Sequence, residues 1–221
     1  ELSFMVSAFH ATPRNQFVRN IHKLTKLKLQ SADGYISQDC RDTTYDFEDG
    51  RMYSGEWGSN ARPHGRGTMI SQDGSKYQGQ WKDGRKDGYG TLVTETFETY
   101  EGDWKNDMKD GNGTLAFPHD NKRKLISYVG QWKRGHRHGR GTLRYTNGDC
   151  VKCEWTRDEP MMPVFVKYTN DREVFIGHFD LKKRVRKGFG VSFFHDSERY
   201  YGLWKKDRRH SLGSAISASG M

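Results

Sequence analysis

A motif of two aromatic residues spaced four apart, with a glycine midway between them, recurs along this chain. Its clearest copy is Tyr77-Gln78-Gly79-Gln80-Trp81, and the second aromatic position is filled at residues 57, 81, 104, 132, 155, 179 and 204. Successive copies are therefore separated by 24, 23, 28, 23, 24 and 25 residues. A near-constant period of this length is typical of a repeat array, in which each unit packs only on its neighbours.

Each copy is expected to form a β-hairpin. Tyr77, Gly79 and Trp81 are two residues apart, so on a strand they point to the same face. A second short strand follows each tryptophan, as at 88–92, and turn signals such as Asp73-Gly74 lead into the next copy. Because a lone hairpin is marginally stable, its aromatic face must pack on the next one. The sequence therefore predicts an all-β repeat array of about seven hairpins that form an elongated twisted ribbon.

The ring positions are the predicted structural anchors of this array. They are Tyr53, Trp57, Tyr77, Trp81, Tyr100, Trp104, Tyr128, Trp132, Phe175, Phe179 and Trp204. A degenerate copy of the motif, Val151-x-Cys153-x-Trp155, lies where the pattern fails, and prolines follow it. We expect the array to cover 53–210 and to be degenerate around 151–170. The other predicted segments are a leader with a helix at 1–34, a lead-in strand at 35–52 and a flexible tail at 211–221.

The segment after Pro13 has the spacing of an amphipathic helix. Phe17, Ile21 and Leu24 would line its apolar stripe, and its polar side is basic, with residues such as Arg19 and Lys23. Such a helix could cap the open edge of the sheet, dock on a partner protein, or lie on an anionic membrane. The sequence leaves these three alternatives open.

Composition points to acidic partners and away from a membrane-spanning or disulfide-bonded protein. Lysine and arginine exceed aspartate and glutamate by 37 − 28 = 9 charges. Only 33% of the residues are hydrophobic and no run of 18 apolar residues occurs. Three cysteines make no disulfide framework. We therefore expect an intracellular location.

No catalytic or metal-binding constellation stands out. The pairs His119-Asp120 and His195-Asp196 fall where other copies have turn residues, and turn chemistry explains them. Cys150-x-x-Cys153 is a lone pair whose members would face opposite sides of a strand. Phosphate-binding loops, nucleophile elbows and HExxH motifs do not occur. We expect no enzyme activity, no cofactor and no metal.

Basic residues gather in the turns that join the predicted strands. As a ridge along one edge they could contact an acidic protein surface such as tubulin, or anionic lipid. The alternative is that they are ordinary solvent-exposed turns with no partner. Nucleic acid is a weaker candidate, because the rings it would stack on are used in packing. The candidate contact residues are Lys122, Arg123, Lys124, Arg137, Arg140, Lys183, Arg184 and Arg186.

The repeat resembles the MORN family (membrane occupation and recognition nexus). Residues 77–92 match its unit, Tyr-x-Gly-x-Trp followed by Gly and then Gly-x-Gly-x-Leu, at every position. The resemblance implies a non-enzymatic scaffold that docks within a large cytoskeletal or ciliary assembly, such as the radial spokes of a flagellar axoneme. Its partners would be other proteins of that assembly, and a homodimer is left open. The alternative is a peripheral adaptor that binds anionic phospholipid membranes through its basic turns.

Overall fold

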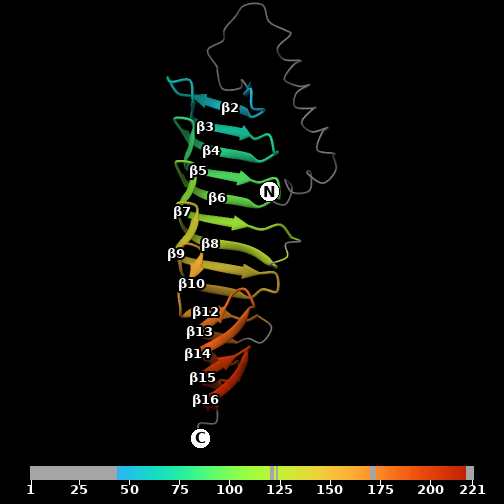
Figure 1. The fold of residues 1–221 in the computed structure, drawn as a ribbon, viewed down its shortest axis with the longest axis vertical. Coiled ribbons are helices and arrows are strands. Elements are labelled where there is room, and N and C mark those ends of the chain that lie inside the picture. Colours follow the sequence, from blue (N-terminus) through green and yellow to red (C-terminus); the bar gives the residue numbers. More distant parts are fainter. Residues whose placement is uncertain (1–43, 120–121, 123, 170–172, 218–221) are drawn as a thin grey trace, which may run out of the picture. The chain divides into compact units, whose positions relative to one another are not determined.

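The structure, a computed structural model, describes residues 44–119, 122, 124–169 and 173–217. Within these residues the chain forms one antiparallel sheet (Figure 1). Its strands are β1 (Thr44–Asp46), β2 (Met52–Trp57), β3 (Pro63–Ile70), β4 (Lys76–Lys82), β5 (Arg85–Val93), β6 (Thr99–Lys105), β7 (Met108–Ala116), β8 (Leu125–Lys133), β9 (His136–Tyr145), β10 (Cys150–Thr156), β11 (Glu159–Pro160), β12 (Val164–Lys167), β13 (Val174–Asp180), β14 (Val185–Phe193), β15 (Arg199–Lys205) and β16 (Arg208–Ile216).

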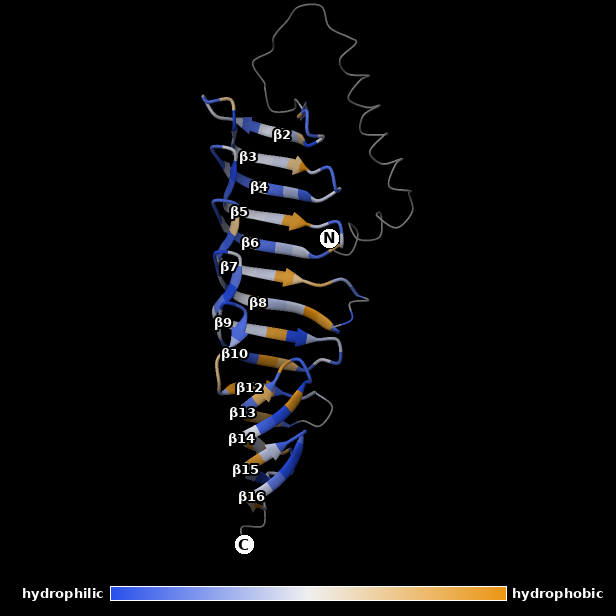
Figure 2. Cartoon of the chain, in the orientation of Figure 1, coloured by the Kyte–Doolittle hydropathy of each residue, from blue (hydrophilic) through white to orange (hydrophobic). Residues whose placement is uncertain are grey.

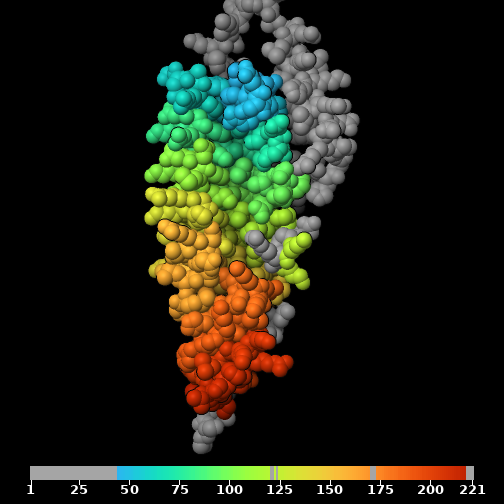
Figure 3. All heavy atoms as spheres, viewed as in Figure 1, coloured from blue at the N-terminus to red at the C-terminus, as the bar shows by residue number. Residues whose placement is uncertain are grey.

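The strands follow one another across the sheet in chain order. Each pairs with the strand before and the strand after it, except that β11 pairs only with β10, which pairs directly with β12. The colours in Figure 3 accordingly pass from blue to red in bands. In such a meander, the turns within hairpins lie along one side of the sheet, at one end of the strands, and the turns between hairpins lie along the other side. These two rows of turns are called the two edges below.

Several turns within hairpins are two residues long, and both residues have positive φ. In the β4–β5 turn φ is 51° at Asp83 and 85° at Gly84, and in the β6–β7 turn it is 49° at Asn106 and 68° at Asp107. Two left-handed residues in sequence give the turn whose twist suits adjacent strands. These short connections fix the register of their hairpins, whereas the β2–β3 and β13–β14 connections are longer.

The core is a ladder of rings on one face of the sheet, here called the ring face. Tyr77 contacts Trp81 of its own hairpin at 5.0 Å and Trp104 of the next hairpin at 5.4 Å between ring centroids, both edge to face. Trp104 also donates a hydrogen bond from Nε1 to the carbonyl of Gly90 at 3.0 Å. The same alternation of tyrosine and tryptophan runs from Tyr53 to Trp155. Each ring therefore belongs to two hairpins at once.

The glycines of the motif make room for the tyrosine ring. Gly79 and Gly90 are paired across β4 and β5, and a Cβ at Gly79 would fall on the Cα of Gly90. The register shifts by two residues after Gly79, because Gln80 of β4 faces three residues of β5, 87–89, which form a β-bulge. The Tyr77 hydroxyl donates to the carbonyl of Gln80, the residue opposite the bulge, at 3.0 Å. The ring, the glycine pair and the bulge thus form one local arrangement.

One segment differs from the sequence prediction. Residues 211–216, expected in a flexible tail, belong to β16, and 213–216 pair with β15. In the degenerate stretch the strand order is kept, because Pro160 lies in β11, outside the main strand order, and Pro163 directly precedes β12. The predicted helix with Phe17, Ile21 and Leu24, and the lead-in before residue 44, lie outside the described residues.

Candidate interaction surface

The ring face is closed by the protein's own basic side chains. Lys86 lies over the rings of Tyr77 and Trp104, at 5.5 and 4.8 Å from their centroids, and Lys109 lies over Tyr100 and Trp132. Burial lowers the pKa of both lysines, and the negative charge of Asp107 opposes the shift at Lys86, as Glu98 and Asp158 do at Lys109. In later hairpins, Arg137, Arg186 and Arg209 take the same place. Cation–π contact therefore covers rings in most hairpins, whereas Pro63 takes the cation's position in the first one.

All the predicted anchor rings except Trp57 are buried on this face. Trp57 is half-buried and contacts Tyr53, Tyr45 and Phe47. Burial also raises the pKa of the ladder tyrosines, to about 12 for Tyr53. The rings are packed against one another and are not free to receive a ligand.

Arg186 is the most enclosed of the covering cations. Its guanidinium lies 3.9 Å from the Trp204 ring centroid, pairs with Glu173 and with Asp207 (Nε to Oδ1, 2.7 Å), and donates to Ser192 Oγ at 3.2 Å. The Arg186 and Glu173 side chains are 11% and 4% exposed. This charge is therefore neutralised inside the protein, and the expectation that Arg186 faces an acidic partner does not fit its position.

Two more of the predicted contact residues have internal partners. Arg137 donates to Asp158 (Nε to Oδ1, 3.0 Å) and lies over Trp155. Burial opposes ionisation of Asp158, but hydrogen bonds from the Arg137 amide, His136 and the Arg137 side chain outweigh it and lower its pKa. Arg184 lies over Tyr145 at 4.3 Å and bonds to Asp149 at 3.4 Å.

The remaining predicted contact residues that the structure describes are exposed but do not form one ridge. Lys122 and Lys124 lie in the connection between hairpins, whereas Lys183 lies in a turn within a hairpin, at the opposite edge. Arg140 is on β9, and its side chain is 89% exposed. Arg123 lies outside the described residues. The candidate contact residues therefore do not form the predicted basic ridge along one edge, because they lie at both edges and on β9.

The face opposite the rings, here called the outer face, changes character along the sheet. Residues in register form one unbroken row across it, one per strand from β3 to β15. In order these are Thr68, Gln78, Thr91, Glu101, Thr114, Val129, Thr142, Lys152, Phe165, Ile176, Val191 and Tyr201. The first part is mostly polar and the last four residues are apolar. Figure 2 colours the residues of both faces, and its orange segments occur on early strands such as β5 and β8 as well as on later ones.

Sequence reasoning missed two sets of residues, and both have a signal in the motif. The residue before each tryptophan, opposite the bulge, is Glu56, Gln80, Asp103 or Gln131. Its side chain accepts a hydrogen bond from an amide of the facing strand, as Gln80 Oε1 does from Tyr89 N at 2.6 Å. The covering cation stands two residues before the first glycine of the second strand, as Lys86 stands before Gly88. Their positions in the motif are regular, but their contacts depend on which residues face each other across the strands, and the spacing of the motif alone does not reveal this register.

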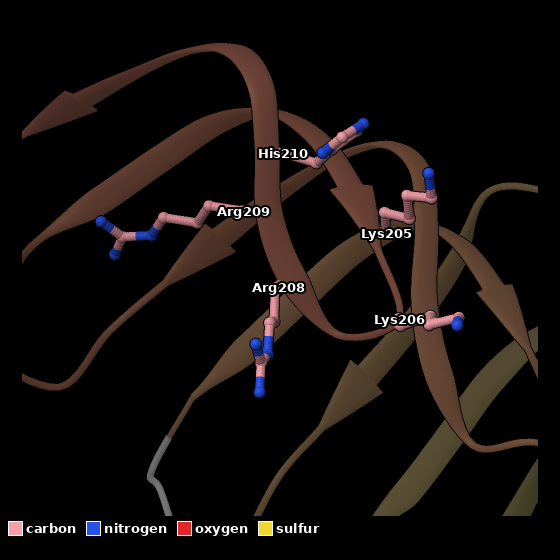
Figure 4. Close-up of a pocket in the computed structure, with 5 residues that line it drawn as sticks. All are labelled: Lys205, Lys206, Arg208, Arg209 and His210. Carbon is pink, nitrogen blue, oxygen red and sulfur yellow. The ribbon is translucent and has the colours of Figure 1, made fainter.

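Other candidate sites offer little chemistry. Cys150 is buried, and burial raises the pKa of the Cys153 thiol to about 11, which makes it a poor nucleophile or ligand. A shallow pocket at the β15–β16 hairpin is lined by Lys205, Lys206, Arg208, Arg209 and His210, whose side chains fan apart (Figure 4). Across 44–119, 122, 124–169 and 173–217, no three His, Cys, Asp or Glu residues are grouped as metal ligands. Nor is any helix there long and apolar enough to cross a membrane.

Comparison with known proteins gives one family match and a set of distant structural likenesses. A family model described as MORN repeat matches residues 53–76, 77–95, 100–118, 128–150 and 200–221. A search of curated proteins finds none that matches this sequence. One similar solved structure is the TCP domain of SAS-4 (dCPAP) from Drosophila melanogaster in complex with a proline-rich motif of Ana2 (dSTIL). It has 11% identity and a TM-score of 0.45, over 87% of this chain and 94% of that chain.

A second similar structure is the TCP10 domain of CPAP from Danio rerio in complex with a peptide of STIL. It has 12% identity and a TM-score of 0.36, over 72% of this chain and 77% of that chain.

Proposed function

This chain is a MORN repeat protein, and on that premise we propose that it is a non-enzymatic scaffold that holds protein partners within a large cytoskeletal or ciliary assembly. The observation that carries the proposal is the closed ring face. In the β4–β5 hairpin the ring of Tyr77, the glycine Gly79 and the cation Lys86 are all used in internal contacts. What remains for other molecules is the outer face and the two edges.

The internal contacts favour a rigid platform. The turn of one hairpin bonds to the start of the preceding second strand, since the Asp107 amide donates to the Lys86 carbonyl at 2.9 Å and the Lys86 amide donates to Asp107 Oδ1 at 2.9 Å. Consecutive hairpins are therefore joined in two ways, by contacts between their rings and by hydrogen bonds between their turns and strands. A sheet held in this way can present partners at fixed separations.

Retention in detergent-extracted cells tests this proposal. A tagged full-length chain, expressed in a ciliated cell, should stay with the cytoskeleton or axoneme after non-ionic detergent and be released only by high salt. The matched control is a Trp104→Ala chain, in which the ladder is interrupted. If detergent alone releases the intact chain, the scaffold proposal is wrong.

A peripheral adaptor for anionic membranes is the second candidate, and the exposed lysines at both edges favour it. Lys122, Lys124 and Lys183 have exposed side chains in a chain of formal net charge +9. Replacing these three with glutamate should abolish flotation with phosphatidylserine vesicles if this function is correct. Arg140→Glu, which changes the same charge on the outer face, is the control. Equal flotation of the triple variant and the parent would exclude the adaptor.

A further inference from the structure

The outer face carries an apolar patch at β12–β15. Phe165, Ile176, Val191 and Tyr201 are opposite one another in successive strands, and Phe189 pairs with Leu203 beside them. We call these six residues the outer patch. Phe189, Leu203 and Ile176 are 57%, 39% and 38% exposed. A sheet face of this composition is normally buried against another element of structure.

The repeat itself does not require apolar residues at these positions. Tyr89 occupies the place of Phe189, between the same two glycines of its own hairpin, and pairs with Asp103 where Phe189 pairs with Leu203. Tyr89 also donates a hydrogen bond to Glu101, so the equivalent surface of the earlier hairpin is polar. The outer patch is therefore a local departure from the repeat and not part of its packing rule.

Four cations flank the outer patch. Lys152 lies beside it in the same row, with its Nζ 6.0 Å from the Phe165 ring centroid, and Arg199 lies 5.8 Å from the ring of Phe193. Lys167, at the end of β12, and Lys205, at the end of β15, are exposed. An apolar centre with a positive rim complements a surface that has an apolar stripe and acidic flanks.

We propose that the outer patch binds an amphipathic α-helix of a partner protein, with an apolar stripe and acidic flanks. The four-residue row spans three strand spacings, about 14 Å. A helix across the strands advances about 5.4 Å per turn, so its i, i+4 and i+7 side chains would fall between successive row residues. Phe189 and Leu203 would then contact one side of the helix. The inference rests on the proposed function, since it names the class of partner that the scaffold holds.

Charge argues against the chain's own segments as the occupant. The amphipathic segment that the sequence predicts near the N-terminus, with Phe17, Ile21 and Leu24, has basic residues beside its stripe, and these would oppose the cations of the rim. The same holds for that segment of a second copy. A membrane surface fits less well, because Phe165, Val191 and Tyr201 are half-buried between neighbouring side chains and do not protrude.

Fluorescence anisotropy with designed peptides tests the proposal on the full chain. One probe is a labelled peptide of about 15 residues with leucine at helical spacing and glutamate on its flanks. The second has lysine in place of glutamate, and the third is a peptide of residues 12–34 of this chain. The first should bind, the other two should bind at least tenfold more weakly, and added salt should weaken the first.

Variants of the chain locate the site. Phe189→Ser with Leu203→Ser should weaken the glutamate peptide at least tenfold, whereas Tyr89→Ser, the equivalent change in an earlier hairpin, should leave its affinity unchanged. Lys152→Glu with Lys167→Glu should reverse the preference between the glutamate and lysine peptides. Circular dichroism and urea unfolding of each variant separate lost binding from lost folding.

Several results would overturn the proposal. One is equal binding of the glutamate and lysine peptides, and another is tighter binding of the 12–34 peptide than of the glutamate peptide. A third is a Phe189→Ser, Leu203→Ser chain that loses binding to phosphatidylserine vesicles but still binds the glutamate peptide. The cell extraction is independent of this assay. If the chain is retained in cells but does not bind the peptide, it is a scaffold that uses another surface. If it binds the peptide but is not retained, the scaffold proposal is wrong and the binding site remains.

Discussion

At the scale of single residues, the sequence identified the rings but not the groups that complete their environment. Tyr77 and Trp81 could be predicted as packing residues, because their two-residue spacing and repetition put them on one face. Lys86 and Gln80 could not. Whether a cation covers a ring, or a side chain caps an amide of the facing strand, depends on a bulge that shifts the register by two residues.

Arg186 provides a test of the covering cations. Arg186→Met should lower the free energy of unfolding by about 3–5 kcal/mol, since the buried Glu173 would lose its ion pair with Arg186. Lys183→Met, a similar loss of charge at an exposed position three residues earlier, should change it by less than about 0.5 kcal/mol. Urea unfolding measures both. Equal effects would show that Arg186 contributes no more than a surface charge.

The buried tyrosines predict loss of stability in alkali. Burial raises the pKa of Tyr53 to about 12 and that of Tyr100 further, from an unfolded value of 10.0. Below pH 10 both states keep the phenol proton, so this stability is fully present. As the pH rises toward the folded values, the unfolded chain ionises first and stability falls. The lowered pKa values of Lys86 and Lys109 act in the opposite direction, but only up to their unfolded value of 10.5.

Tyr100→Phe isolates one of these groups. At neutral pH it should cost about 0.5–1.5 kcal/mol, because the hydrogen bond to the Asp103 carbonyl is lost. Above pH 10.5 the variant should lose stability less steeply than the parent. Unfolding in urea at a series of pH values gives both quantities, and parallel slopes would contradict the assignment.

At the scale of the hairpin, the sequence predicted the strands and turns but not the reason for each glycine. Gly79 is required by the close approach of Gly90 and the Tyr77 ring, whereas Gly74 has φ +87° and open space where a Cβ would be. The spacing alone does not separate these two causes. Steric exclusion acts at the first position and backbone conformation at the second.

Alanine at these two positions separates the causes. Gly74→Ala should cost about 1–2 kcal/mol, the strain of a left-handed residue with a Cβ. Gly79→Ala should cost about 3 kcal/mol or more, because backbone atoms of two strands must move apart. Thermal or urea unfolding measures both variants. A Gly79→Ala chain as stable as Gly74→Ala would mean that the strands separate easily.

At the scale of the whole sheet, the period predicted the strand order, but the motif alone did not show how the strands pair in the degenerate stretch around 151–170. Prolines argue against a central strand, yet the chain places Pro160 in a short side strand and Pro163 before β12, so the pairing of β10 with β12 survives. The outer patch was not predictable from the motif, because outer-face positions vary freely between copies. Only the register shows that Phe165, Ile176 and Val191 adjoin.

Removal of one complete hairpin should leave the sheet intact. Deleting 77–99 joins Lys76 to Tyr100, which occupies the place of Tyr77. Spin labels at Thr68 and Thr142, six strand spacings apart, should approach by two spacings, about 10 Å. Pulsed electron resonance measures this distance. An unchanged or broad distribution would show that the hairpins are not interchangeable.

The chain-order pairing of the strands also bears on how this protein can evolve. A duplication or loss of one hairpin changes the separation between distant surfaces by a fixed increment and inverts neither face, because each unit contributes two strands. The outer patch would be carried along unchanged at its new distance from the first hairpins. Mutation can thus alter the spacing of bound partners in steps, without a new fold and without rebuilding either binding surface.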